Sequence, residues 1–381
     1  MANALTLSSF AENIFRARDT VARELTGFIP AALTNSDSNG VSINGTVNSL
    51  RTAQPTLNTS YTPAMTIPAG DDQTVYNDTV AIDQVANVRI PLRGEDVKKL
   101  ENVGQYQSTI DNMFAQAIRT QVNAIELYTA GVAYKGASRA YGTSGTAPFA
   151  SDLSDVNNIG KILDDNGTPR DGLRSLVINT TAGVKLRNLT QLTNVNQAGS
   201  DLTLRKGSLL DISGFAIRES ANVTTSGTKG TGTSYVLNGT HAIGSTSIIV
   251  KTGSGTVVAG DVITINSVQY VVKTGIAAAG TLVINTPGLV AAGADGDTVT
   301  ITNAYTANVG FHKNALEIVL RPPAQPYGGD AATDRMTVSD PISGLVFEVA
   351  LYKGYGMNML DITTLYGVKV WKPDFVAILK G

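Results

Sequence analysis

The side chains that most often carry catalysis or bind metals are scarce in this 381-residue chain. Cysteine is absent, which excludes disulfides, thiolate metal sites and cysteine nucleophiles. The two histidines, His241 and His312, lie far apart in the sequence, so we expect no multi-histidine metal centre. No His-Glu-x-x-His pair, phosphate-binding glycine loop or Gly-x-Ser-x-Gly turn occurs. We therefore predict that the chain is not an enzyme and holds no cofactor and no metal.

Two short acidic clusters are the remaining candidates for cation binding. Asp164-Asp165-Asn166-Gly167 resembles the start of a calcium loop, but Thr168 and Pro169 follow where that loop needs a ligand and then a glycine. A helix that stops at this point explains the cluster better. Asp295-Gly296-Asp297 could bind a cation, but a turn between two strands is the favoured interpretation.

Composition places the chain among proteins that fold around their own cores. Hydrophobic residues make up 42% of it, and its length is typical of two or three domains. The net charge is −2, and no cluster of Lys and Arg is interleaved with aromatics, which argues against tight, phosphate-driven binding of nucleic acid. No apolar run suits a membrane helix and the N-terminus lacks a signal-peptide pattern. We expect synthesis in a reducing cytosol and no membrane partner.

Residues 52–88 contain no Lys and no Arg. Apolar residues recur on both sides of a turn at Pro68–Asp71, which predicts a long β-hairpin with too few apolar positions for a core of its own. Such a hairpin must lie on something, and its charge of about −4 favours a basic surface. It either folds back on its own chain or packs on a neighbouring subunit. We adopt the second interpretation, and the predicted subunit-interface residues are its four acids, Asp71, Asp72, Asp78 and Asp83.

Helical periodicity is clearest over residues 105–132, where Met113 and Ile125 belong to one apolar stripe. We expect one long spine helix there. A shorter amphipathic helix is expected over residues 10–25, after a capping box that begins at Ser9. This shorter helix either packs on its own domain or forms an arm on a neighbouring subunit.

The composition changes abruptly between Glu219 and Glu317, where the chain has no Glu and no Arg. The stretch is rich in Gly, Thr and Val, which predicts a small β module inserted into a larger host. We expect a barrel or sandwich whose two ends lie close together. Its predicted strands are 234–237, 247–251, 261–266, 268–272, 281–285 and 298–301.

The host surrounds this insert on both sides. Before it, strands alternate with helices, which predicts an α/β subdomain; after it, alternating apolar residues predict antiparallel hairpins. The predicted division is 1–50 an N-terminal arm, 51–92 an extended acidic hairpin, 93–150 a peripheral domain with the spine helix, 151–222 an axial α/β subdomain, 223–304 the inserted β domain, and 305–381 the returning hairpins.

Six motifs stand out in the host: Tyr141–Phe149, Ile162–Pro169, Ser175–Gly183, Gly214–Ser220, Phe311–Ala315 and Tyr366–Pro373. These motifs and the order of the elements resemble the major capsid (coat) proteins of tailed bacteriophages, and in particular the coat-protein family of Salmonella-type podophages. The resemblance implies an α+β fold of the Hong-Kong-97 type. Its parts would be an N-terminal arm, an extended hairpin loop, a spine helix, an axial subdomain, an antiparallel peripheral sheet and an inserted small β-barrel or sandwich.

The resemblance also implies a function. Copies of such a protein form hexamers and pentamers of an icosahedral shell, the virion capsid, which encloses packaged double-stranded DNA. The implied partners are further copies of the chain, a scaffolding protein, a portal protein and DNA bound without sequence specificity, with assembly in the host bacterial cytoplasm. One family variant cross-links its subunits through a lysine in the extended loop. The first lysine here is Lys98, so we expect non-covalent clamping instead.

Two alternatives stay open from the sequence. A bacterial nanocompartment shell protein has the same fold, but the inserted β module counts against it. A β-rich surface or tail binding protein would account for 223–304 and would leave the spine helix unexplained.

Overall fold

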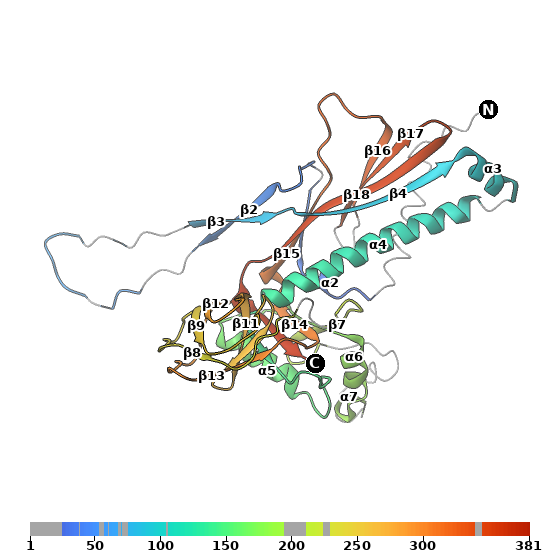
Figure 1. Cartoon of the computed structure of the whole chain (residues 1–381). Coiled ribbons are helices and arrows are strands. Elements are labelled where there is room, and N and C mark those ends of the chain that lie inside the picture. The colour runs from blue at the N-terminus through green and yellow to red at the C-terminus, as the bar shows by residue number, and fades with distance from the viewer. Residues whose placement is uncertain are drawn as a thin grey trace.

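A computed structural model describes residues 25–381, except 38, 53–56, 60, 68–69, 71–74, 104–105, 194–210, 224–228 and 340–344. Figure 1 shows a long helix beside an upper sheet, a lower body that includes a small barrel, and a thin arm that projects from the sheet. The described strands form a six-stranded sheet, an eleven-stranded sheet and a two-stranded ribbon. The helix expected over residues 10–25 lies almost wholly outside the described residues.

The predicted spine helix is present as α4, Tyr106–Lys135, and it packs against the upper sheet. Ile110 and Ile125 are buried in the main core, as the apolar stripe predicts. Met113 is an exception, because its side chain is exposed. A shorter helix, α3 (Gly94–Val103), precedes α4.

The upper sheet has the strand order β1-β15-β18-β17-β16, and β4 pairs with the other edge of β18. All neighbours are antiparallel except β1, which runs parallel to β15. The antiparallel hairpins expected near the C-terminus are therefore confirmed. The strand bounds are β1 Leu33–Ser36, β4 Gln84–Arg93, β15 Leu316–Arg321, β16 Ala332–Ser339, β17 Val346–Lys353 and β18 Met357–Val370.

The arm is a ribbon of β2 (Thr46–Thr52) and β3 (Val75–Ala81), together with the described residues between them, 57–59, 61–67 and 70. The predicted hairpin spans residues 51–92, whereas the arm begins at Thr46 and ends at Ala81. The strand that follows, β4, pairs with β18 and belongs to the upper sheet. Alternation of apolar residues continues from β3 into β4, so periodicity alone does not mark where the chain leaves the arm.

The lower body combines helices with the eleven-stranded sheet. The run β6–α6–α7–β7 places β6 and β7 parallel to each other, which matches the expected α/β alternation. The bounds are α2 Phe28–Ala31, β5 Arg139–Tyr141, α5 Ser154–Asp165, β6 Arg174–Ile178, α6 Thr180–Arg187, α7 Thr190–Thr193, β7 Phe215–Glu219, β14 Ala307–His312, η1 Lys313–Ala315, η2 Pro373–Phe375 and β19 Val376–Lys380.

Residues 234–302 contain six strands at nearly the predicted positions. Each pairs antiparallel with two others, in the closed order β10-β13-β8-β9-β12-β11 and back to β10. The strands therefore close into a barrel, and β11 also pairs with β5 of the host. Their bounds are β8 Tyr235–Leu237, β9 Ser247–Lys251, β10 Val262–Ile265, β11 Val268–Thr274, β12 Gly280–Ile284 and β13 Thr298–Thr302.

The described apolar side chains gather in four cores. The largest lies between α4 and the sheets, the second surrounds α5 and α6, and the third fills the barrel. A fourth, small core joins the base of the arm to the upper sheet. The barrel thus has its own interior, while the arm shares its base with the host.

Candidate functional site

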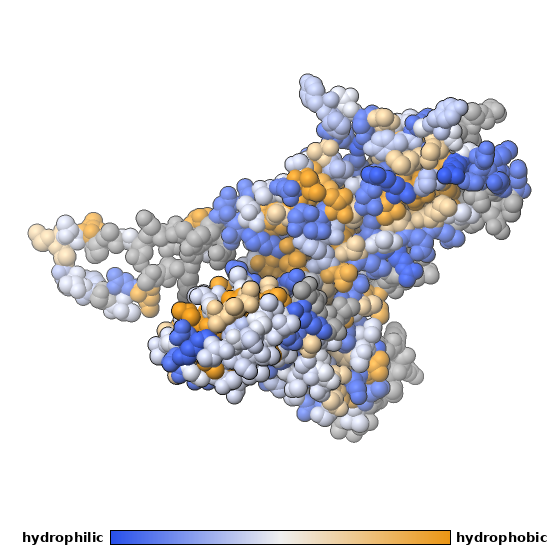
Figure 2. Space-filling model, in the orientation of Figure 1, coloured by the Kyte–Doolittle hydropathy of each residue, from blue (hydrophilic) through white to orange (hydrophobic). Residues whose placement is uncertain are grey.

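The distal part of the arm presents large apolar side chains to solvent. Tyr61 is 93% exposed, and Leu57, Met65 and Ile67 are also almost fully exposed. Figure 2 shows a few hydrophobic residues, in orange, on the projecting arm, between neutral and hydrophilic ones. A two-stranded ribbon is marginal in water, and clustered exposed apolar side chains mark contact surfaces. The exposed side chains make the arm the candidate contact surface of this chain.

The base of the arm is fixed to its own chain. Val80 and Ile82 are buried against Val319 and Leu365 of the upper sheet. The Lys369 ammonium donates a hydrogen bond of 2.7 Å to the carbonyl of Thr79. The arm therefore leaves the body from a packed, hydrogen-bonded root.

Two of the four predicted interface acids, Asp78 and Asp83, lie among the described residues. Asp71 and Asp72 lie outside the described residues. Asp78 is half-buried on β3, opposite Ser49 of β2. Both carboxylate oxygens of Asp83 accept the hydroxyl of Tyr128 on α4, at 3.1 and 2.9 Å. The contact of Asp83 is within one chain, and the assignment of all four acids to a subunit interface stays a prediction.

The Asp83 contact also affects the phenol of Tyr128. Burial, together with the hydrogen bond to Asp83, raises the pKa of Tyr128 to about 12. The phenol therefore keeps its proton at neutral pH and ties the segment between β3 and β4 to the spine helix.

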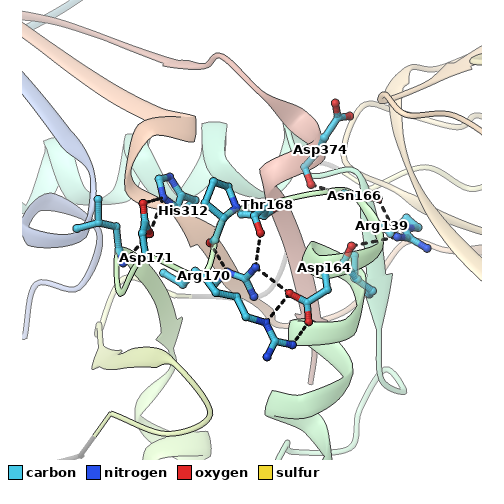
Figure 3. A network of polar contacts seen from close by, with 12 residues as sticks. Arg139, Asp164, Asn166, Thr168, Arg170, Asp171, His312 and Asp374 are labelled. Atoms are coloured by element: carbon cyan, nitrogen blue, oxygen red, sulfur yellow. Dashed lines mark hydrogen bonds and ion pairs between the residues drawn. The ribbon is translucent and has the colours of Figure 1, made fainter. Parts of the chain in front are cut away.

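A polar network lies at the C-terminal end of α5 (Figure 3). Asp164 accepts hydrogen bonds from two guanidinium groups, those of Arg170 and Arg174. Arg174 also donates to the carbonyls of Thr168 and Pro169, and its side chain is only 3% exposed. The Arg170 hydrogen bond, helped by Arg174, lowers the pKa of Asp164 to about 2. The carboxylate is therefore charged at neutral pH and fixes the loop that follows α5.

The same loop is tied down on its other side. The Nε2 of His312 lies 3.1 Å from both oxygens of Asp171, and Nδ1 accepts the backbone N–H of Asn314. Because Nδ1 is an acceptor, the ring proton sits on Nε2 and points to the carboxylate. Asn166 accepts from Arg139 at 2.8 Å, and its amide donates to the carbonyl of Asp374 (Figure 3).

Both acidic clusters singled out in the sequence have structural roles. The helix stop is confirmed, since α5 ends at Asp165 and Gly167 adopts a φ of +76°. Asp295 accepts the ammonium of Lys251 and the N–H of Gly239, as expected of a turn between strands. Among the described residues, no group of three or more His, Cys, Asp or Glu could hold a metal ion. No helix in that part of the chain is long and apolar enough to cross a membrane.

Several buried acids were not identified from the sequence, and Glu126 is the most completely buried of those described. Glu126 lies at 0% exposure in the middle of α4, and its carboxylate accepts the backbone N–H groups of Gly27, Phe28 and Ile29. The hydroxyl of Ser220 is a fourth donor, at 2.8 Å. The signal in the sequence is a single charged residue directly after Ile125 in an apolar stripe. Periodicity marks such a residue as anomalous but does not name its partners.

Comparison with known proteins gives no match to a protein-family model and none to a curated protein. Solved structures do resemble the chain. One is described as the capsid structure of the cyanophage P-SCSP1u, with 15% identity, 94% of this chain and 88% of that chain covered, and a TM-score of 0.48. Another, from Mycobacterium phage Che8, has 16% identity, 88% and 84% covered, and a TM-score of 0.46. A virus-like particle from Pyrococcus furiosus has 10% identity, 97% and 99% covered, and a TM-score of 0.42.

All three superpositions are loose. These similarities are too low to assign the function of those proteins to this chain. A function has to be argued from the residues of this chain.

Proposed function

We propose that this chain is a structural, non-catalytic subunit of a closed protein shell, the major capsid protein of a tailed bacteriophage. The observation that carries the proposal is the arm, which is rooted in its own chain and carries almost fully exposed apolar side chains such as Tyr61 and Met65. Such a surface is stable in water only when it is covered. When many copies of the chain pack together, the arm of one copy would be covered by the surface of another.

The geometry of such a contact favours rings. An arm that reaches from one copy onto a different surface of the next makes a heterologous contact, and heterologous contacts close into rings when the rotation permits. Hexamers and pentamers are such rings. Each contact can be weak, because a copy held at several places at once gains stability from multivalency.

The finer parts of the proposal follow from the resemblance of the six sequence motifs. They are a Hong-Kong-97-type fold with an inserted β-barrel, an icosahedral shell around packaged double-stranded DNA, and assembly in the host cytoplasm with scaffolding and portal proteins. A net charge of −2 suits a DNA container, since a strongly basic inner wall would hinder packing and release.

Sedimentation velocity of the purified chain over a range of concentrations tests the proposal. The native chain should form large particles, and the triple variant Tyr61→Ser, Met65→Ser, Ile67→Ser should stay small while its circular dichroism spectrum is unchanged. A native chain that sediments as a monomer at every concentration, both alone and with a scaffolding protein, would contradict a shell function. Particles of equal size from the variant would show that the arm is not the contact.

A further inference from the structure

One face of the spine helix α4 carries an exposed stripe without any charged side chain. Leu127 on it is 52% exposed, and the hydroxyl of Thr120 donates to the carbonyl of Gln116 of the same helix at 2.9 Å. None of the described elements covers this face. An uncharged, partly apolar helix face is typical of a surface that packs on another element. The α4 stripe consists of Met113, Gln116, Thr120, Ala124 and Leu127.

The N-terminal segment of the chain is fixed beside this stripe. The carboxylate of Glu126 accepts the backbone N–H groups of Gly27 and Phe28, at 2.6 and 2.8 Å. The next residue of α4 is Leu127, at the end of the stripe. Leu25, the first described residue, lies close to this junction in the sequence and is 50% exposed. The chain that precedes Leu25 therefore starts at the C-terminal end of the α4 stripe.

The sequence of this preceding segment suits an uncharged partner. Its charges can pair within the segment, because Glu12 lies one helical turn before Arg16. Asp19 and Arg23 repeat that spacing. A helix over 10–25 thus has a polar face that needs no partner on α4, and a separate apolar face. The apolar face consists of Phe10, Ile14, Ala17, Val21 and Leu25.

The lengths of the two faces agree. A helix rises about 22 Å from Phe10 to Leu25, at 1.5 Å per residue. The stripe rises about 21 Å from Met113 to Leu127. A helix that runs from the junction towards the N-terminal end of α4 therefore covers the whole stripe. In the opposite direction α4 ends at Lys135, whose carbonyl accepts a hydrogen bond from the barrel.

We propose that residues 10–25 form a helix that packs on the α4 stripe of the same chain, parallel to α4. The contact covers Leu25 and Leu127, which are both half exposed among the described residues. Thr120 and Ala124 are short side chains, so the two helix axes can approach to the usual distance of about 8–10 Å. The proposal does not depend on the shell function, because the contact lies within one copy. The same segment of a neighbouring copy is the competing occupant.

Introduced cysteines test this contact without background, because the native chain has none. Ala17→Cys with Thr120→Cys is the test pair, since the two positions lie at similar distances from the junction. Asp19→Cys with Thr120→Cys is the matched control, because Asp19 lies on the polar face of the expected helix. A disulfide needs Cα atoms within about 7 Å of each other, so we expect the test pair to oxidise at least about tenfold faster than the control.

The product identifies the occupant. Oxidised in dilute, unassembled chain, the test pair should form an internal loop that runs as a monomer on a non-reducing gel, whether or not shells form at higher concentration. Equal rates for the two pairs, or no disulfide in either, would overturn the proposal. Disulfide-linked dimers from the test pair would also overturn it, since they would assign the segment to a neighbouring copy.

Hydrogen exchange tests the same contact without cysteines. In the native chain the amides of residues 10–25 should be protected. In Ala124→Glu they should exchange at least about tenfold faster, because the helix would have to bury an unpaired carboxylate. Val184→Glu is the matched control, since Val184 is also an exposed apolar residue of a helix, at 52% exposure, and should leave the exchange unchanged. Unprotected amides in the native chain, or equal changes in the two variants, would refute the contact.

Discussion

The carboxylate of Glu126, in the middle of the spine helix, accepts the backbone N–H of Phe28 at 2.8 Å. Gly27, Ile29 and Ser220 donate to the same carboxylate. The start of α2 is therefore capped by a side chain almost a hundred positions further along the sequence. This contact fixes the point at which α2 meets α4. The side chain of Glu126 is completely buried there.

Replacing Glu126 with glutamine should loosen this junction. An amide offers one oxygen where the carboxylate offers two, and its NH₂ group faces donors instead of acceptors. We expect the free energy of unfolding to fall by about 2 kcal/mol, since buried N–H groups lose a charged acceptor. Urea denaturation measures the change. Glu101→Gln is the control, because Glu101 is exposed and pairs with the exposed Lys98, at 3.7 Å; equal losses in the two variants would refute the role of Glu126.

The Asp164 network predicts a pH dependence of stability. The pKa of Asp164 is about 2 in the folded chain, below the value of about 3.9 for an unfolded aspartate. The stability that it adds is therefore fully present above about pH 4 and is lost as the pH falls toward 2.

Asp164→Asn should remove that part of the pH dependence. We expect it to lower the free energy of unfolding by about 2 kcal/mol at pH 7, because Arg174 stays buried without its anion. Thermal unfolding between pH 2 and pH 7 compares the variants. Asp165→Asn is the matched control, since that carboxylate is half exposed and lies 3.8 Å from Arg139; it should cost less than about 1 kcal/mol. A native chain and an Asp164→Asn variant with parallel pH profiles would rule out the predicted linkage.

Some parts of the structure can be predicted from the sequence, and others cannot. Local periodicity locates α4 and the six barrel strands, because each depends on residues close together in the chain. It does not locate the closure of the barrel, where β8 pairs with β13 some sixty residues later, as Val299 does with Tyr235. Partners of isolated buried charges, such as Glu126 and Arg174, are equally out of reach, since they are set by the tertiary fold.

For the arm, too, the sequence predicts the local element but not the tertiary contacts. The absence of Lys and Arg from 52–88 predicts an acidic projection, and the arm is found there. What the pattern does not reveal is that Asp83 contacts Tyr128 of its own chain. Asp83 thus has a partner within its own chain, which the sequence does not show.

The acids near the predicted turn should act in assembly and not in folding. Changing both Asp71 and Asp72 to Lys reverses the charge of this predicted turn, while the root of the arm is unchanged. We expect a native circular dichroism spectrum together with failed or distorted particles in electron micrographs. The neutral pair Asp71→Asn and Asp72→Asn should have a smaller effect. Normal particles from the charge-reversed variant would show that these acids do not contribute to a subunit interface.

The six-stranded barrel should fold by itself. Its interior is filled by its own side chains, including Tyr235, Tyr270 and Ile284, and its strands form a closed cycle. Residues 223–304 expressed alone should therefore give well-dispersed amide signals by NMR. A collapsed, undispersed spectrum would mean that the pairing of β11 with β5, and the two hydrogen bonds from Asn285 to host carbonyls, are required for folding.

Electron microscopy in negative stain tests the central claim most directly. The chain should be expressed alone and together with a scaffolding protein, then imaged without further treatment. The shell function predicts closed particles or sheets of hexamers in at least one of the two preparations. A uniform population of small particles in both would contradict it, and the barrel would then become the first place to look for function.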